Sequence, residues 1–438
     1  MRTIFSTNIN NTKKFKRQLL QWSQQFQEIV WLDSNEISHP HAKYDAILAV
    51  DALTTFKTDY SDAFEQLKEY KNSANDWILG YLSYDLKNDV EQLSSTNRDD
   101  LGFADLQFFQ PKKLFLLMGD KLDMLYLRMC DDEMEYDYNV ISTTSIPSLQ
   151  SIIEKKKNET TPPVKIKLRI HKEAYYEKLK GVLSRIYRGD IYETNFCQEF
   201  YAEDARINPM ETYLNLNDIS IPPFATFMKF DEHYLLSASP ERYLRRDGDT
   251  IISQPIKGTA KRSDDKLEDK RLIDALANDP KERSENVMIV DLVRNDLSKY
   301  AKKGSVQVEE LCKVYTFKQV HQMISTITAE LKTNTDSVDV IKASYPMGSM
   351  TGAPKISAMK IIEEFEETKR GVYSGAVGYF TPDDDFDFNV IIRSILYNNR
   401  TKYVSYSVGG AITAGSIPEK EYEECLIKAK AMRQVLEG

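Results

Sequence analysis

The chain has 438 residues, of which 41% are hydrophobic and 29% are charged, a balance typical of a folded globular protein rather than a disordered one. Its 58 lysines and arginines against 67 aspartates and glutamates give a net charge of −9, which argues against a nucleic-acid-binding protein, because such proteins need a basic face. No run approaches the ~20 apolar residues of a membrane span. The first residues also lack the apolar core of a signal peptide.

The cysteines are too far apart in the sequence to share chemistry. They form no CxxC pair, so neither a disulfide framework nor a zinc site is expected. These features predict a cytoplasmic protein with no nucleic-acid or membrane partner. The cysteines are Cys130, Cys197, Cys312 and Cys425.

The first part of the chain is rich in strand-like segments, which are residues 44–53, 76–86 and 112–129. A polar stretch from Ser142 to Lys167 follows, and its Pro162-Pro163 pair indicates a soft boundary. We therefore expect an amino-terminal region of residues 1–160 and a second region of residues 165–438. The two are expected to be fused into one compact body.

The second part mixes helices with antiparallel strands. The expected elements are a helix over 172–189, a hairpin over 233–258, successive strands over 371–380, 386–398 and 402–413, and a helix over 416–438. The hairpin is expected to turn at Asp247-Gly248. The last helix has Ser416 as its predicted N-cap and Pro418 in its first turn. This mixture predicts the α+β class.

Two predicted helices carry glutamates at matched spacing. Glu282 and Glu285 are i,i+3 neighbours after a helix start at Asp279-Pro280. Glu421 and Glu424 repeat this spacing in the last helix. Either pair taken alone is more often a solvated helix face than a site. If the two faces meet, repulsion requires a cation between the carboxylates, and oxygen donors without histidine favour Mg²⁺.

Three further motifs suit an anionic ligand. The stretch GSMTGAPK, residues 348–355, places small residues and Thr351 before a helical run, where free backbone N–H groups face an anion. The Gly409-Gly410 pair at a strand end lets a backbone approach a ligand closely. Tyr373 and Arg393, in consecutive predicted strands, are placed to clamp a carboxylate. Each motif is weak alone, and together they predict a small di-anionic ligand.

Seven motifs resemble, in this order, those of the chorismate-utilising enzymes: SASPERYL, PIKGT, ENVMIVDLVRNDL, GSMTGAPK, YSGAVGYF, VGGAIT and EYEECLIKAKAM. The resemblance runs from about Lys172 to the last residue, and the earlier region resembles the amino-terminal part of some members only loosely. It implies an anthranilate-synthase-like α+β fold, in which two antiparallel sheets form the core and helices lie outside.

The resemblance also implies roles for individual residues. Glu285 and Glu424 would bind Mg²⁺ directly, and the ion would hold the ring carboxylate of chorismate. Glu282 and Glu421 would act on the ion through water. The residues expected to bind the substrate are Tyr373 and Arg393 at the enolpyruvyl carboxylate, together with Gly409, Gly410, Thr351, Thr259 and Gln322.

By the same resemblance, Glu241 of the SPE motif would be the general acid that protonates the departing ring hydroxyl. Burial must then raise its pKa. One position departs from the family pattern, because members usually carry histidine where this chain has Gln322. Glutamine orients a substrate but cannot shuttle a proton. The neighbouring His321 points elsewhere in a strand, so the role does not pass to it.

The stretch SQPIKGTAKR, residues 253–262, raises the question of what Lys257 does. One reading is a surface lysine in a turn. The other follows from the resemblance, because lysine here is typical of the branch that makes aminodeoxychorismate, whereas anthranilate synthases usually carry alanine. Members that add water carry a lysine where this chain has Glu193, so ammonia is the expected nucleophile. Burial and Mg²⁺ are expected to lower the pKa of Lys257 and make its amine a covalent nucleophile.

The resemblance therefore implies conversion of chorismate and ammonia to 4-amino-4-deoxychorismate, for para-aminobenzoate and folate synthesis, through a Lys257 intermediate. No segment resembles a glutamine amidotransferase, so a separate amidotransferase subunit is expected to supply the ammonia. Two alternatives stay open, namely anthranilate synthase component I and an inactive chorismate-binding partner subunit. Ser34, in the stretch WLDS, resembles a serine that binds tryptophan in related enzymes.

Overall fold

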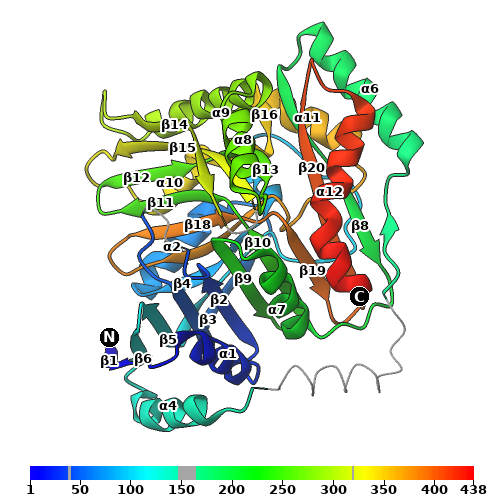
Figure 1. Cartoon of the computed structure of the whole chain (residues 1–438). Helices are drawn as coiled ribbons and strands as arrows, with labels where there is room; N and C mark the ends of the chain where they lie inside the picture. The colour runs from blue at the N-terminus through cyan, green and yellow to red at the C-terminus, as the bar shows by residue number, and fades with distance from the viewer. Residues whose placement is uncertain (38–40, 147–163, 318–319) are drawn as a thin grey trace.

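Antiparallel strands form the framework of the protein. The structure, a computed structural model, describes residues 1–37, 41–146, 164–317 and 320–438. Within these residues, hydrogen bonds join 20 strands into one continuous network, and the pairings between the named strands are antiparallel. Helices lie around them (Figure 1), which confirms the α+β class.

The described strands are, in chain order, β1 (Arg2–Asn8), β2 (Glu28–Asp33), β3 (Ala46–Thr58), β4 (Ile78–Leu82), β5 (Leu106–Met118), β6 (Lys121–Leu127), β7 (Lys167–Leu168), β8 (Glu193–Ala202), β9 (Phe224–Phe230), β10 (His233–Ser239), β11 (Arg242–Asp247), β12 (Thr250–Gln254), β13 (Ile256–Lys261), β14 (Gln307–Thr316), β15 (Val320–Glu330), β16 (Gly352–Ala353), β17 (Ala376–Phe380), β18 (Phe386–Val390), β19 (Ser394–Asn398) and β20 (Tyr403–Thr413).

The described α-helices are α1 (Thr12–Ser23), α2 (Ala63–Ala74), α3 (Lys87–Val90), α4 (Met134–Thr143), α6 (Lys172–Arg188), α7 (Pro209–Ser220), α8 (Lys266–Ala277), α9 (Pro280–Ser298), α10 (Ser337–Ser344), α11 (Lys355–Phe365) and α12 (Pro418–Glu437). Single turns of 3₁₀ helix occur at η1 (Tyr84–Leu86), η2 (Asp131–Glu133) and η3 (Gly348–Met350). None of the described helices is both long and apolar enough to cross a bilayer.

The strand network has two halves, which meet at the long strands β3 and β5. One half runs through β14, β15, β12, β11, β18, β17, β4 and β5. The other runs through β3, β2, β9, β10, β19, β20 and β8. The amino-terminal strands β2 and β4 thus pair with β9 and β17 from the later region. The expected boundary between residues 160 and 165 falls mostly within 147–163, outside the described residues.

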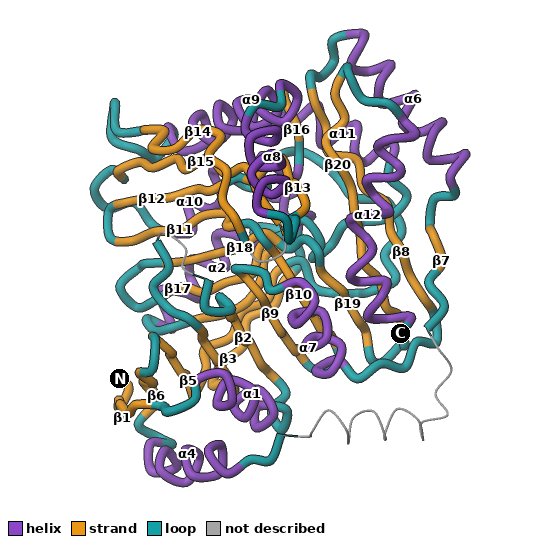
Figure 2. The backbone as a smooth tube through the Cα atoms, viewed as in Figure 1, coloured by secondary structure: helices purple, strands orange, loops and turns teal. Residues whose placement is uncertain are grey.

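Neighbouring side chains along a strand fill different cores, as the two-residue period of a strand requires. Leu235 of β10 packs in a core that joins both halves, with Met228 and Phe388 among its members. Leu236, the next residue, packs in a second core with Leu179 of α6. Residues of α7 and α12 belong to this second core too. These helices therefore cover the outer face of the second half (Figure 2).

Local signals set the ends of the site helices. Asp279 caps α9, because its Oδ1 accepts from the backbone N–H groups of Lys281 and Glu282 at 2.9 and 3.0 Å. This confirms the expected helix start. The Ser416 cap predicted for α12 is wrong. Ile417 is the N-cap, while the Ser416 hydroxyl accepts from the backbone N–H of Thr413 at 3.1 Å.

Two strand predictions also need correction. Residues 386–398 form two strands rather than one, because the chain breaks between β18 and β19 at Arg393, whose φ is 52°. Lys257 lies inside β13 rather than at a strand end. The register of β13 against β15 shifts between Ile256 and Thr259, and Gly258 between them has a φ of 88°. That left-handed conformation favours glycine.

Candidate active site

Lys257 lies in the interior and pairs with a carboxylate on a different strand. Its Nζ is 3.0 Å from Oε1 of Glu193, the first residue of β8. The side chains of the two residues are 11% and 2% exposed. The reading of Lys257 as a solvated surface lysine is therefore wrong.

The pKa of Lys257 moves in the opposite direction from the one expected. Burial lowers it, but the carboxylates of Glu193, Glu285 and Glu241 raise it and outweigh burial, so the net pKa is raised. Without a metal, Lys257 is therefore held as an ammonium ion. This direction could not be predicted from the sequence, which does not show how many carboxylates face the amine.

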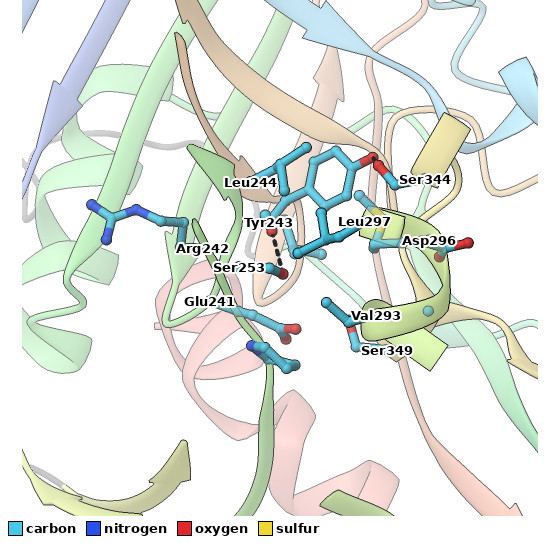
Figure 3. A pocket seen from close by; sticks show the side chains of 14 residues that line it. Glu241, Arg242, Tyr243, Leu244, Ser253, Val293, Asp296, Leu297, Ser344 and Ser349 are labelled. Carbon is cyan, nitrogen blue, oxygen red and sulfur yellow. Dashed lines mark hydrogen bonds between the residues drawn. The ribbon is translucent and has the colours of Figure 1, made fainter. Parts of the chain in front are cut away.

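Glu241 follows β10 and is 5% exposed. Burial raises the pKa of its carboxyl to about 7, although Ser349 and Lys257 act against the rise. It therefore stays partly protonated near neutral pH, as a general acid must. Glu241 and Ser349 line a pocket (Figure 3), which Ser253 and Tyr243 also line.

Helices α9 and α12 bring four glutamates together, which we call the carboxylate cluster: Glu282, Glu285, Glu421 and Glu424. The Nζ of Lys281 is 3.8 Å from Glu285 Oε1 on its own helix and 3.5 Å from Glu421 Oε1 on α12. All four carboxylates raise the pKa of this lysine and outweigh the lowering by burial. The two faces therefore meet, and neither is a separate solvated face.

The glutamates of the cluster differ in pKa. Burial raises the pKa of Glu285 to about 7, and it also raises that of Glu282. Glu424 has a lowered pKa, because its ion pair with Lys428 outweighs the effect of burial. The two charged atoms of that pair are 2.6 Å apart.

The cluster has the chemistry of a hard-cation site. Its donors are all oxygens, which Mg²⁺ prefers, and the buried Oε1 of Glu285 has no hydrogen-bond partner within the described residues. In the same residues, no three acidic, histidine or cysteine side chains are arranged closely enough to hold a metal ion. The ammonium groups of Lys281 and Lys428 supply the positive charge instead. The residue types thus fit Mg²⁺, which would take the place of the lysine ammonium groups beside the carboxylates.

Gly409 and Gly410 of β20 lack side chains for different reasons. A Cβ on Gly409 would lie 2.4 Å from the carbonyl of Phe196 and 2.5 Å from the Sγ of Cys197, so close packing against β8 requires glycine. A Cβ on Gly410 would lie 3.5 Å from carboxylate oxygens of both Glu421 and Glu424. That is ordinary contact, so Gly410 places the backbone directly against the carboxylate cluster.

Tyr373 and Arg393 lie on turns rather than in the predicted strands. Tyr373 is 4% exposed, and its hydroxyl is 3.5 Å from the Sγ of Cys197. Arg393 is half-buried, and burial lowers its pKa, while Tyr373 and Glu424 act in the opposite direction. Its guanidinium has no hydrogen bond or ion pair in the described part of the chain. A half-buried arginine without a partner is well suited to an added carboxylate.

The three other predicted substrate residues, Thr259, Gln322 and Thr351, differ from one another in burial and in the contacts they make. Thr259 and Gln322 are cross-strand partners on β13 and β15; Thr259 is exposed and Gln322 is buried. The Thr351 hydroxyl donates to the carbonyl of Gly348 at 3.2 Å, within its own loop. His321 contacts Asp269 at 2.9 Å through Nε2, so it faces away from the position of Gln322.

Ser34 lines a second pocket together with Tyr44, Phe224 and Tyr379. Its hydroxyl is buried and has no hydrogen-bond partner among the described residues. Arg242 lines both this pocket and the one beside Glu241, but none of the predicted site residues lines both.

Sequence reasoning missed the parts played by Glu193 and Lys281. Glu193 drew notice only as a position where related enzymes carry a lysine, although it is the ion partner of Lys257. Lys281 carried a usable signal, because it lies one helical turn before Glu285 and so shares its face.

Comparison with known proteins places this site in a family. A family model for chorismate binding enzymes matches residues 16–434. The chain belongs to the chorismate-binding enzyme family. The resemblance seen in the seven motifs is thereby confirmed, and the match extends into the amino-terminal region.

Individual relatives carry two different names. Aminodeoxychorismate synthase component 1 of Escherichia coli (strain K12) is 30% identical over 436 residues, which cover 93% of this chain and 92% of the relative. Anthranilate synthase component 1 of Aquifex aeolicus (strain VF5) is 32% identical over 369 residues, 82% of this chain and 74% of the relative. Identity alone therefore does not separate the two activities.

A solved structure supports the fold. Anthranilate synthase component I from Streptococcus pneumoniae TIGR4 matches with a TM-score of 0.77 at 26% identity, over 90% of this chain and 93% of that chain. This similarity confirms the anthranilate-synthase-like α+β fold expected from the sequence.

Proposed function

We propose that this enzyme converts chorismate and ammonia to 4-amino-4-deoxychorismate through a covalent intermediate on Lys257. The observation that carries the proposal is the position of this amine, which is buried, paired with Glu193 and close enough to the general-acid candidate Glu241 for each to shift the pKa of the other. A buried amine inside a cluster of carboxylates has groups at hand to take its proton and to return it.

The proposed reaction balances within these three side chains. Lys257 passes a proton from Nζ to Glu193 Oε1, across the 3.0 Å contact, and its lone pair then attacks ring carbon 2. The ring double bonds shift and the bond from carbon 4 to its hydroxyl breaks, while Glu241 donates the proton that lets the hydroxyl leave as water. Ammonia adds at carbon 4, Lys257 leaves carbon 2, and Glu241 takes a proton from the new amine. Glu193 finally returns its proton to Lys257.

The proposed cofactor is Mg²⁺. Glu285 and Glu424 would hold it directly, and Glu282 and Glu421 would do so through water, because these are the hard oxygen donors that α9 and α12 present together. When bound, the ion would neutralise and position a carboxylate of the substrate. Arg393 and Tyr373 would hold the other carboxylate, which gives the unpaired guanidinium a partner.

The proposed source of ammonia is a separate glutamine amidotransferase subunit. Such enzymes need an accessible nucleophilic cysteine, and all four cysteines of this chain are buried. Burial also raises the pKa of the Cys197 thiol to about 12, which makes it a poor nucleophile at neutral pH.

Product analysis tests the proposal. Chorismate, ammonium and Mg²⁺ are incubated with the enzyme, and the products are separated by chromatography with and without a lyase that converts aminodeoxychorismate. The wild-type protein should form aminodeoxychorismate. Lys257→Ala should lose most of this activity, and Lys257→Arg should be inactive as well, because a guanidinium stays protonated. Full product formation by the alanine variant would show that Lys257 is not a nucleophile.

The second candidate is anthranilate synthase component I, which the similarly close relatives of that name favour. It predicts fluorescent anthranilate from wild-type protein without any added lyase. We also propose tryptophan as the ligand of the Ser34 pocket, since an unpaired buried hydroxyl beside Tyr44 and Tyr379 suits an aromatic amino acid. Calorimetric titration with tryptophan, with Ser34→Val as the control, tests this assignment.

A further inference from the structure

Lys281 occupies an unusual place for a lysine. It lies in the first turn of α9, where the helix dipole disfavours a cation. Its side chain is 47% exposed, so it has room to point into water. Instead its Nζ turns toward Glu285 and Glu421, at 3.8 and 3.5 Å. The attraction of the carboxylates therefore outweighs the dipole.

This ammonium joins two helices that would otherwise repel each other. Glu285 belongs to α9 and Glu421 to α12, and both are buried. Four carboxylates at close range cannot all ionise unless positive charge lies among them. Lys281 belongs to α9, and its ammonium group contacts a carboxylate from each of the two helices.

Lys428 plays a more fixed part on the other side of the cluster. Its Nζ lies 2.6 Å from Glu424 Oε1 and donates to the carbonyl of Gly409 at 2.8 Å. Among the described residues Lys281 has no such backbone anchor, and its contacts to the carboxylates are longer, at 3.8 and 3.5 Å. A long, half-exposed side chain with loose contacts is the one that can leave.

We propose that Lys281 is a tethered counter-ion, which holds the carboxylates of α9 and α12 together before metal binding and is displaced from Glu285 and Glu421 by the divalent cation. This inference rests on the proposed Mg²⁺ site. It makes the metal-free site a closed, charge-compensated state rather than an empty cage. Metal binding then competes with an internal cation, so the affinity of the site is set partly by a residue that is no ligand.

The test replaces Lys281 by methionine, which keeps most of the length of the side chain and removes its charge. Binding of Mn²⁺, used as the probe, is measured at pH 8 without chorismate by electron paramagnetic resonance of the free ion. Lys281→Met should bind Mn²⁺ at least about tenfold more tightly than wild type, because a positive charge a few ångströms from the ion is gone. Lys281→Arg should keep near-wild-type affinity.

Thermal unfolding in EDTA supplies the second readout. Lys281→Met should melt lower than wild type when no metal is present, because the carboxylates then lack their counter-ion, and added Mn²⁺ should restore the loss. Lys430→Met is the matched control, because Lys430 is an exposed lysine of α12, and its loss changes net charge equally. This control should alter neither readout.

The outcomes separate this inference from the proposed function. If wild type binds Mn²⁺ and Lys281→Met binds it equally or more weakly, the counter-ion role is wrong while the metal site stands. An unchanged melting temperature of Lys281→Met in EDTA would also overturn the role. If wild-type protein binds no Mn²⁺ at all, the proposed metal site fails and the inference fails with it.

Discussion

Two groups of charged side chains lie near β8, and they differ in how completely their buried atoms are paired. In the pair Glu366–Arg370, Arg370 donates to Glu366 at 2.6 and 2.9 Å, and its remaining donors reach the carbonyls of Met350 and Asn195 at 2.6 and 3.0 Å. Glu366 also accepts from the backbone N–H of Cys197 at 2.9 Å. Charge and hydrogen bonds are both balanced, so this pair fastens η3 and α11 to β8.

The carboxylate cluster and the Lys257–Glu193 pair lack this balance. Glu285 Oε1 and Glu193 Oε2 are buried without a hydrogen bond in the described residues, and the cluster has more negative than positive charge. Buried polar atoms are nearly always paired in a finished interior. Unpaired atoms beside groups of shifted pKa therefore mark the place where a ligand completes the structure.

The sharpest way to break this comparison is to remove one charge from the unbalanced group. Glu285→Gln should abolish activity at physiological Mg²⁺, since it deletes a charged direct ligand. The fold should survive, because a buried carboxylate facing other carboxylates is replaced by a neutral amide. Glu282→Gln should lose only ~10–100-fold, as expected for a residue that acts through water. Activity measured against Mg²⁺ concentration checks this, and an unchanged metal requirement in Glu285→Gln would contradict it.

Removing one charge from the balanced pair should have the reverse effect. Arg370→Met leaves Glu366 buried and unpaired, which costs about 3–5 kcal/mol of unfolding free energy for a buried pair. Both side chains are 3% exposed, so water cannot take over. Urea unfolding of this variant beside Glu285→Gln tests the contrast directly. Equal stability of the two variants would show that the two groups of charge do not differ in kind.

The pH dependence of the reaction sharpens the comparison further. Glu241 has a pKa of about 7 in the metal-free protein, and only its protonated form donates to the leaving hydroxyl. The part of kcat/KM that depends on Glu241 should therefore fall as pH rises through about 7, at saturating Mg²⁺ and a constant concentration of free ammonia. Glu241→Gln should lose this limb together with most of the activity. A limb that persists in the glutamine variant would belong to another group.

Sequence signals correctly predicted those structural features that depend on residues close together in the chain. The helix start at Asp279, the end of α6 at Gly189 and the turn at Asp247-Gly248 depend on neighbouring residues, and all three are confirmed. The break at Arg393 was missed, because a single residue in a left-handed conformation inside an apolar run leaves no periodic trace. Ser416 misled because a proline is tolerated in the first turn of a helix, so the cap before Pro418 could be Ile417 or, one residue earlier, Ser416.

In the site, too, features that depend on local spacing were predictable from the sequence, and features that depend on distant contacts were not. Spacing alone put Glu282 and Glu285 on one face of a helix, and the family motifs placed that face opposite Glu421 and Glu424. The direction of the Lys257 pKa shift was not predictable, because its partner Glu193 lies 64 positions away along the chain. Contacts over such distances follow from the fold as a whole and not from any window of sequence.

The smallest effect expected from these changes is electrostatic, and it tests the unbalanced pair without any catalysis. Glu193 is the carboxylate that most raises the pKa of Lys257, whereas burial lowers it. Replacing this carboxylate by an uncharged amide in Glu193→Gln removes the largest of the effects that raise the pKa and leaves the lowering by burial in place. The pKa of Lys257 should therefore fall, and its amine should react at a lower pH. Labelling with an amine-selective reagent over a pH series, with the Lys257 peptide quantified by mass spectrometry, measures this directly.

The exposed Lys430 provides an internal standard, because its labelling should not change between the two proteins. A Lys257 labelling curve that stays in place, or moves to higher pH, would mean that Glu193 does not control the charge of this lysine.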